Sequence, residues 1–157
     1  KGVNSAIENL LQFRLDEGSK LESEITSRID KLTTLLSEIA PFAKNRINKI
    51  KESLSEKLTE LDSKNIDENR FEQELIYYLE KQDITEEQVR LSAHLNYFLE
   101  TMKTDVPNGK KLGFISQEIG REINTIGSKS SDAEMQKIVV QMKDELEKIK
   151  EQLLNIL

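Results

Sequence analysis

Apolar residues recur at intervals of three or four along most of this 157-residue chain, the spacing of one face of an α-helix. The longest such run has apolar residues at positions 25, 29, 32, 36, 39, 43, 47, 50, 54, 58 and 61. This run predicts a long amphipathic helix with a coiled-coil-like seam. Pro41 lies inside it, and we expect the proline either to kink the helix or to divide it into two collinear pieces.

The rest of the chain is also predicted to be helical. A helix over 3–17 precedes the long run or begins it, with Gly18 as a weak point. Later helices are predicted over 67–81, 84–103, 110–126 and 132–156. No stretch has the alternating pattern of a strand, so the expected fold is all-α, with long antiparallel helices in a coiled-coil-like bundle.

Short local signals place the boundaries of these helices. Asn65-x-x-Glu68 and Asp83-x-x-Glu86 have the pattern of capping boxes, which begin helices. Val106-Pro107-Asn108-Gly109 predicts a tight turn, and Gly127 predicts a helix end. We therefore expect a helical arm over 1–62 and a helical domain over 63–157. Because the chain enters a helical pattern at once and lacks an initial methionine, we expect an N-terminal domain of a longer protein to be absent.

Composition limits the classes of function. The absence of cysteine excludes disulfides and thiolate metal sites and favours the cytoplasm, and no apolar run is long enough to predict a membrane span. The net charge of −6 comes from one block, residues 67–87, which has eight acidic and two basic residues. Between 110 and 129 there are four basic and two acidic residues. The acidic total therefore does not decide whether the partner is a nucleic acid.

Polar residues with chemical potential share one face of the predicted helix 84–103. Glu87, Arg90, His94 and Tyr97 are spaced by three or four, and Glu86 lies beside them. His94 is the sole histidine, so any imidazole role as ligand or proton carrier falls to it. The alternatives are a hydrogen-bonded packing histidine and, for the two glutamates, a favourable interaction with the helix dipole.

A second group of carboxylates lies on the predicted helix 110–126. Glu118 and Glu122 are four residues apart, on one face with Thr125, and repel each other unless a cation lies between them. Arg121 is one candidate for that cation. The other is Mg²⁺ or Mn²⁺, which prefers oxygen ligands and completes its shell with water and phosphate. If the two helices pack together, Glu86, Glu87, Glu118 and Glu122 form a candidate metal site.

Further polar residues beside these carboxylates are suited to binding a nucleic-acid backbone. Arg90 and Arg121 would stabilise phosphate charge, and the flanking cations and hydroxyl would bind phosphates. Asn124 and Thr125 are suited to the backbone or a ribose hydroxyl. The flanking residues are Lys110, Lys111, Ser128 and Lys129. Solvated cations and capping residues are the alternative interpretation of each position.

Five segments of the chain resemble the C-terminal half of the YicC/YloC family of bacterial proteins. The segments are FRLDEGSKL, ENRFEQEL, DITEEQVRLSAHL, GKKLGFISQEIGREINTIGSKSSD and VVQMKDELEKIKEQLLNIL, which together span nearly the whole chain. The resemblance implies a cytoplasmic, metal-dependent endoribonuclease that acts on structured RNA, assembles as a hexamer and carries an additional N-terminal domain. Gln88, Lys150 and the LLNIL ending depart from the family pattern, all outside the carboxylate positions.

The combined hypothesis is a metal-dependent RNA phosphodiesterase site between two helices. His94, Glu86 and Glu122 would act in catalysis, and the four glutamates would hold Mg²⁺ or Mn²⁺. The alternative is a non-catalytic RNA-binding or assembly module in which Arg90 and Arg121 pair with the glutamates. A coiled-coil scaffold without RNA affinity is the third possibility.

Overall fold

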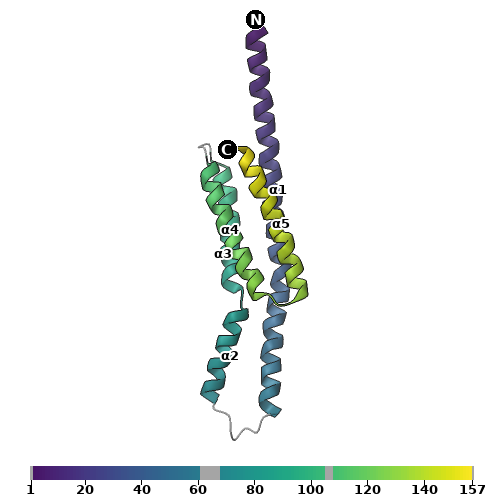
Figure 1. Ribbon diagram of the computed structural model, residues 1–157, viewed down its shortest axis with the longest axis vertical. Helices are drawn as coiled ribbons and strands as arrows, with labels where there is room; N and C mark the ends of the chain where they lie inside the picture. Colours follow the sequence, from purple (N-terminus) through teal and green to yellow (C-terminus); the bar gives the residue numbers. More distant parts are fainter. Residues whose placement is uncertain (1, 61–67, 105–107, 157) are drawn as a thin grey trace.

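A computed structural model describes residues 2–60, 68–104 and 108–156. In these ranges the chain forms five α-helices and no strand (Figure 1), which confirms the all-α prediction. The helices are α1 (Gly2–Glu60), α2 (Glu68–Gln82), α3 (Thr85–Met102), α4 (Gly109–Lys129) and α5 (Ala133–Ile156). None of the helices in the described ranges is both long and apolar enough to cross a membrane.

Helix α1 continues without interruption through both Gly18 and Pro41, so it is not divided into pieces. Proline removes one backbone hydrogen bond and crowds the preceding turn. On either side of it, however, Ile39 is fully buried and Ala43 packs against the same core. Tertiary packing on both sides therefore holds the helix together across the proline.

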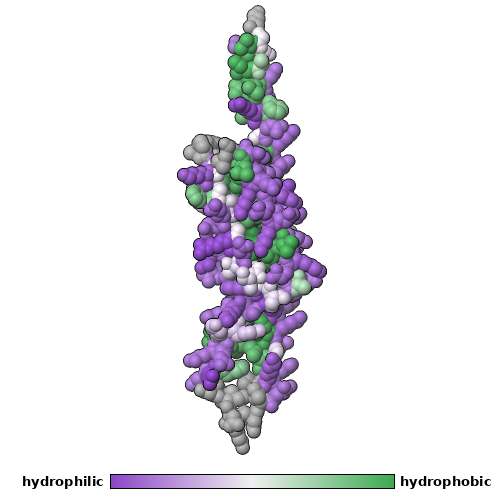
Figure 2. Space-filling view, in the orientation of Figure 1, coloured by the Kyte–Doolittle hydropathy of each residue, from purple (hydrophilic) through white to green (hydrophobic). Residues whose placement is uncertain are grey.

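Four helices form an antiparallel bundle, and α2 lies outside it. In Figure 1, α1 and α4 run downward while α3 and α5 run upward. Helix α2 lies beside the lower part of α1, below the bundle. The first turns of α1 extend beyond the bundle and expose apolar side chains (Figure 2). These exposed side chains are Val3, Ile7, Leu10, Leu11, Phe13 and Leu15.

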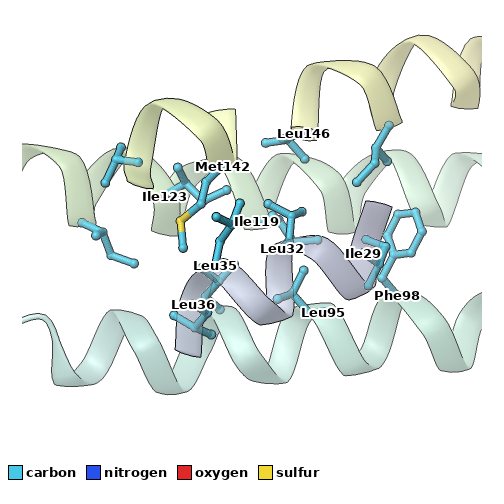
Figure 3. Close-up of a cluster of buried hydrophobic side chains, with 14 of the residues drawn as sticks. Ile29, Leu32, Leu35, Leu36, Leu95, Phe98, Ile119, Ile123, Met142 and Leu146 are labelled. Carbon is cyan, nitrogen blue, oxygen red and sulfur yellow. The ribbon is translucent and has the colours of Figure 1, made fainter. Parts of the chain in front are cut away.

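The core is built from the apolar faces that the helical spacing predicts (Figure 3). On α1, positions 25, 29, 32, 36 and 39 are buried and 43, 47, 50 and 54 are half-buried, whereas the side chains of 58 and 61 lie outside the described part of the chain. On α5, Met135, Ile138, Val139, Met142, Leu146, Ile149 and Leu153 are buried. Because α1 shares this core with α3, α4 and α5, the predicted arm and domain are joined through it.

Two glycines allow α4 and α5 to approach closely. A Cβ atom on Gly120 would lie 3.1 Å from Leu146 Cδ2, and one on Gly127 would lie 3.1 Å from Val139 Cγ1. The predicted helix end at Gly127 is wrong, because α4 continues to Lys129. Gly127 serves the contact between helices and not the termination of one.

The start of α3 also differs from its prediction. The carboxylate of Asp83 accepts hydrogen bonds from the Thr85 backbone N–H at 2.9 Å and from the Thr85 hydroxyl at 2.5 Å. The backbone N–H of Asp83 donates to Leu79 O at 2.8 Å, so Glu86 does not close a capping box with it. The hydrogen bonds from Thr85 lower the pKa of Asp83.

Two other boundary predictions fall partly outside the described residues. Asn65 of the first capping box and residues 106 and 107 of the predicted turn lie there. Asn108, which follows them, is the N-cap of α4 but makes no side-chain cap. Its side-chain amide donates to Thr101 O at 2.5 Å and to Thr104 Oγ1 at 3.1 Å, which joins the start of α4 to the end of α3.

Candidate functional site

An open groove of about 570 Å³ lies between α3 and α4. It is lined by Arg90 and His94 from α3 and by Glu118, Arg121, Glu122 and Thr125 from α4. Six predicted site residues from two separate segments therefore lie around one groove.

The apolar positions next to these residues hold the two helices together. Leu91 and Leu95 of α3 and Ile119 and Ile123 of α4 are almost fully buried in the common core. Arg90 and His94 are four residues apart, as are Glu118 and Glu122, so each pair lies along one side of its helix. Packing of the apolar faces thus brings the two polar rows to the same opening.

Most of the charged side chains in this groove have no partner within the described part of the chain. His94, Glu118, Arg121 and Glu122 make no side-chain hydrogen bond or ion pair with any described residue. Glu122 is only 6% exposed. Arg121, the candidate cation between the two glutamates, pairs with neither of them. Glu118 and Arg121 are exposed, and the Glu122 carboxylate oxygens keep contact with solvent although the residue is largely buried. These groups are therefore open to a ligand in the groove.

Glu86 and Glu87 do not line the groove. Glu86 is exposed and forms an ion pair with Arg90, one turn further along α3. Glu87 is 4% exposed and receives Lys129 Nζ at 2.8 Å, while the same ammonium group donates to Asp83 O at 3.2 Å. Glu87 Oε2 is buried and has no hydrogen-bond partner. Glu87 therefore joins α3 to the end of α4.

The four glutamates predicted as metal ligands are thus not gathered into one site. In the described ranges, no group of three or more His, Asp or Glu side chains is placed to hold a metal ion. Glu118 and Glu122 remain as one pair of oxygen donors beside the groove. That donor set fits the usual binding mode of Mg²⁺, which takes one or two carboxylates together with water and substrate phosphate.

The remaining predicted RNA-binding residues have mixed surroundings. Lys110 and Asn124 are exposed, and Lys111 Nζ lies 5.0 Å from the centre of the Tyr97 ring. The Thr125 hydroxyl donates to Arg121 O at 3.1 Å and the Ser128 hydroxyl to Asn124 O at 3.0 Å. Both hydroxyls are engaged by their own helix, and Lys129 is engaged by Glu87.

Sequence reasoning missed a buried carboxylate on the opposite side of the bundle. Glu145 of α5 is 3% exposed and binds Arg28 and Lys31 of α1 at 3.1 Å each, with Lys148 at 3.7 Å. Burial alone would raise the pKa of Glu145, but hydrogen bonds from Lys31 and Arg28 outweigh burial and lower it. Its position, three residues after Met142 and four before Ile149, was the available signal that it faces the core.

Comparison with known proteins identifies one family that covers most of the chain. The family model described as "Endoribonuclease YicC-like, C-terminal" matches residues 39–157. A protein of Clostridioides difficile named "Probable endoribonuclease YicC" is 41% identical over 99% of this chain and 54% of its own length. A protein of the same name from Haemophilus influenzae is 30% identical over 94% of this chain and 51% of its own length.

The chain belongs to the YicC-like endoribonuclease family, and it spans about half the length of the curated relatives that it matches. The predicted resemblance is therefore confirmed.

Proposed function

We propose that this chain is the helical part of an endoribonuclease and that the groove between α3 and α4 is where the RNA phosphodiester is cleaved. Membership of the family and the names of the curated relatives support the reaction class. The observation that carries the location is the set of unpartnered side chains His94, Glu118, Arg121 and Glu122 around one opening. The alternative of a structural salt-bridge network predicts that Arg90 and Arg121 pair with the glutamates, and in the described part of the chain only Arg90 does so, with Glu86.

The groove has the groups that phosphodiester hydrolysis needs. Water attacks phosphorus and gives up a proton to a base, the bond to the leaving oxygen breaks, and that oxygen takes up a proton from an acid. In this proposal Glu122 and His94 carry the protons, and Arg90 and Arg121 stabilise the negative charge on the phosphate. Glu86 positions Arg90 through their ion pair.

Residues around the groove would hold the RNA strand. In this proposal Lys110, Lys111 and Ser128 would contact phosphates, and Asn124 and Thr125 would contact the sugar or backbone, with the two hydroxyls turning away from their own helix. Lys129 contributes charge near the strand while its ammonium group remains bound to Glu87.

Glu118 and Glu122 are the side chains that would hold Mg²⁺ or Mn²⁺ in this proposal. When bound, such an ion polarises the phosphate and lowers the pKa of water. The dependence on a metal, the hexameric assembly and the cytoplasmic location implied by the family resemblance remain predictions.

Incubation of the chain with a structured RNA hairpin, with Mn²⁺ or with EDTA, tests the proposal. We expect cleavage with Mn²⁺, no cleavage with EDTA, and a melting temperature that rises with Mn²⁺ concentration. Cleavage that is unchanged in EDTA would contradict the dependence on a metal and would leave the proposed cleavage site standing. RNA binding without cleavage, both with Mn²⁺ and with EDTA, would contradict endoribonuclease activity and favour the non-catalytic RNA-binding module.

A further inference from the structure

A second and larger groove, of about 790 Å³, shares no lining residue with the candidate cleavage site. Its walls come from the lower part of α1, from α2 and from the turn between α4 and α5. Figure 1 shows α2 beside this part of α1, and Figure 2 shows apolar side chains between them with polar ones around.

Arg46 builds one wall of this second groove. Its guanidinium group donates to Lys129 O at 2.6 Å and to Ser131 Oγ at 2.7 Å. These bonds fix the turn between α4 and α5 against α1. Because Lys129 also binds Glu87, the wall is connected to the start of α3.

Two lysines of this groove are exposed and have no ion pair within the described part of the chain. Lys49 and Lys57 line the groove together with Ser53, at intervals of four residues along α1. Eight residues of α-helix span about 12 Å, so these cations form a line along the groove. Such a line of cations and a hydroxyl is suited to consecutive phosphates of one strand.

The acidic residues of the groove are already satisfied by other groups. The carboxylate of Asp132 accepts the backbone N–H of Glu134 at 3.0 Å at the start of α5. The carboxylate of Glu134 lies 3.4 Å from Lys137 Nζ. The lining therefore has three cations against two carboxylates, and both carboxylates have partners.

Aromatic and amide groups complete the lining. Tyr78 of α2 is 48% exposed and Phe42 of α1 is 37% exposed, so both rings have free area for stacking. The side-chain carbonyl oxygen of Gln82 is buried without a hydrogen-bond partner. Ring faces accept any base, so Tyr78 and Phe42 are suited to stacking without sequence preference.

We propose that this groove, the α1–α2 groove, binds a single-stranded segment of RNA at a distance from the cleavage site. Lys49 and Lys57 bind its phosphates, and a base stacks on Tyr78. The proposal rests on the proposed function, because the strand would belong to the RNA that is cleaved between α3 and α4. In this proposal α2 forms one wall of the RNA-binding groove.

Binding of a fluorescein-labelled 12-nucleotide oligouridylate, followed by anisotropy in EDTA at several salt concentrations, tests this groove. For Lys49→Gln/Lys57→Gln we expect the slope of log K against log salt to be reduced by about 1.4, or 0.7 for each lost phosphate contact. For Tyr78→Leu we expect binding weakened by about fivefold to 150-fold at constant salt. The matched control, Lys20→Gln/Lys51→Gln, removes two exposed lysines that do not line the groove and should keep the wild-type slope.

The outcomes separate this proposal from the proposed function. Suppose that the wild-type chain cleaves hairpin RNA and that the Lys49/Lys57 variant keeps its helicity, salt slope and RNA affinity. RNA binding in the α1–α2 groove is then disproved, and the proposed cleavage site stands. If those two substitutions weaken binding of an oligoglutamate peptide and not of RNA, the groove is a peptide site and the proposal is overturned. If the wild type neither binds nor cleaves RNA, both proposals fail. Ultraviolet cross-linking of 4-thiouridine RNA to the peptide that contains Tyr78 gives support independent of the lysine variants.

Discussion

Two charged regions of this bundle have opposite arrangements. Glu145, between α1 and α5, is a buried carboxylate with three cations within ion-pair distance and a lowered pKa. Between α3 and α4, Glu122 is buried to a similar degree and has no partner within the described part of the chain. Both lie among apolar residues on long helices, so burial alone does not distinguish them.

The difference lies in what surrounds each carboxylate. The Glu145 carboxylate is paired and hydrogen-bonded, so it joins α1 to α5. Its removal would leave the positive charges of Arg28 and Lys31 without a counter-charge. The Glu122 carboxylate has no such partner, and its oxygens stay in contact with solvent at the groove, where a ligand can reach them. In our proposal Glu145 therefore belongs to the architecture, and Glu122 with its neighbours belongs to the chemistry.

Arg121→Gln is expected to give the largest change among single substitutions. Because Arg121 has no partner in the described chain, its loss should change stability by less than about 0.5 kcal/mol. Loss of a group that stabilises transition-state charge should reduce the cleavage rate by about 10²- to 10³-fold. Single-turnover cleavage and thermal melting measure the two effects. Arg14→Gln, the same change at an exposed position of α1, is the control and should leave the rate unchanged.

Glu145→Gln is expected to have the reverse effect, on stability and not on chemistry. It removes the carboxylate that binds Arg28 and Lys31, and we expect a loss of about 2 kcal/mol, because these partners remain partly solvated. A chain of this size should then melt about 4–8 °C lower. The control Glu147→Gln removes an exposed carboxylate that has only Lys150 at 3.7 Å and should change little. If Glu145→Gln lowers the cleavage rate per folded molecule, the purely structural role of Glu145 is contradicted.

Glu87→Gln separates a joining residue from a metal ligand. In its ion pair with Lys129 the Glu87 carboxylate is buried and the lysine is partly exposed. We therefore expect the substitution to lower the free energy of unfolding by about 1–2 kcal/mol. We also expect the Mn²⁺-dependent rise in melting temperature to be retained in this variant. Loss of the Mn²⁺-dependent rise, with helicity unchanged, would show that Glu87 is a metal ligand after all. Glu86→Gln is the control, because its exposed pair with Arg90 is worth only about 0.3–0.5 kcal/mol.

Acid titration gives the smallest expected effect. The folded pKa of Glu145 lies below its ordinary value of 4.5, so its contribution to stability is present above that value and is lost as the pH falls through the folded pKa. The difference in melting temperature between wild type and Glu145→Gln should therefore be largest near neutral pH and shrink below about pH 4.5. A difference that grows as the pH falls would show that Glu145 is not held as an anion.

Helical spacing was enough to predict much of the fold. The apolar positions of α5 from Met135 to Leu153 are all buried, and the four later helices begin and end within three residues of their predicted bounds. A run of apolar residues at helical intervals defines its own buried face, whatever neighbour covers it. The continuity of α1 through Pro41 was not predictable, because it depends on core packing from other helices.

Part of the candidate site was predictable for the same reason. Arg90 and His94 share one side of α3, and Glu118 and Glu122 share one side of α4, so packing of the two helices brought them to one groove. The partner of Glu87 could not be predicted, since Lys129 is 42 residues away and reaches it only after α4 has continued past Gly127. Local spacing shows which residues share a face but not which distant side chain meets them.

The double variant Glu118→Gln/Glu122→Gln tests the central claim, that the unpartnered charges between α3 and α4 carry the chemistry. Cleavage of a hairpin RNA should be abolished, while helicity and melting temperature stay at or above those of the wild type, because no partner is lost. Glu52→Gln/Glu56→Gln, two exposed glutamates at the same spacing on α1, is the matched control and should cleave normally. Wild-type cleavage by the Glu118/Glu122 variant would contradict the account.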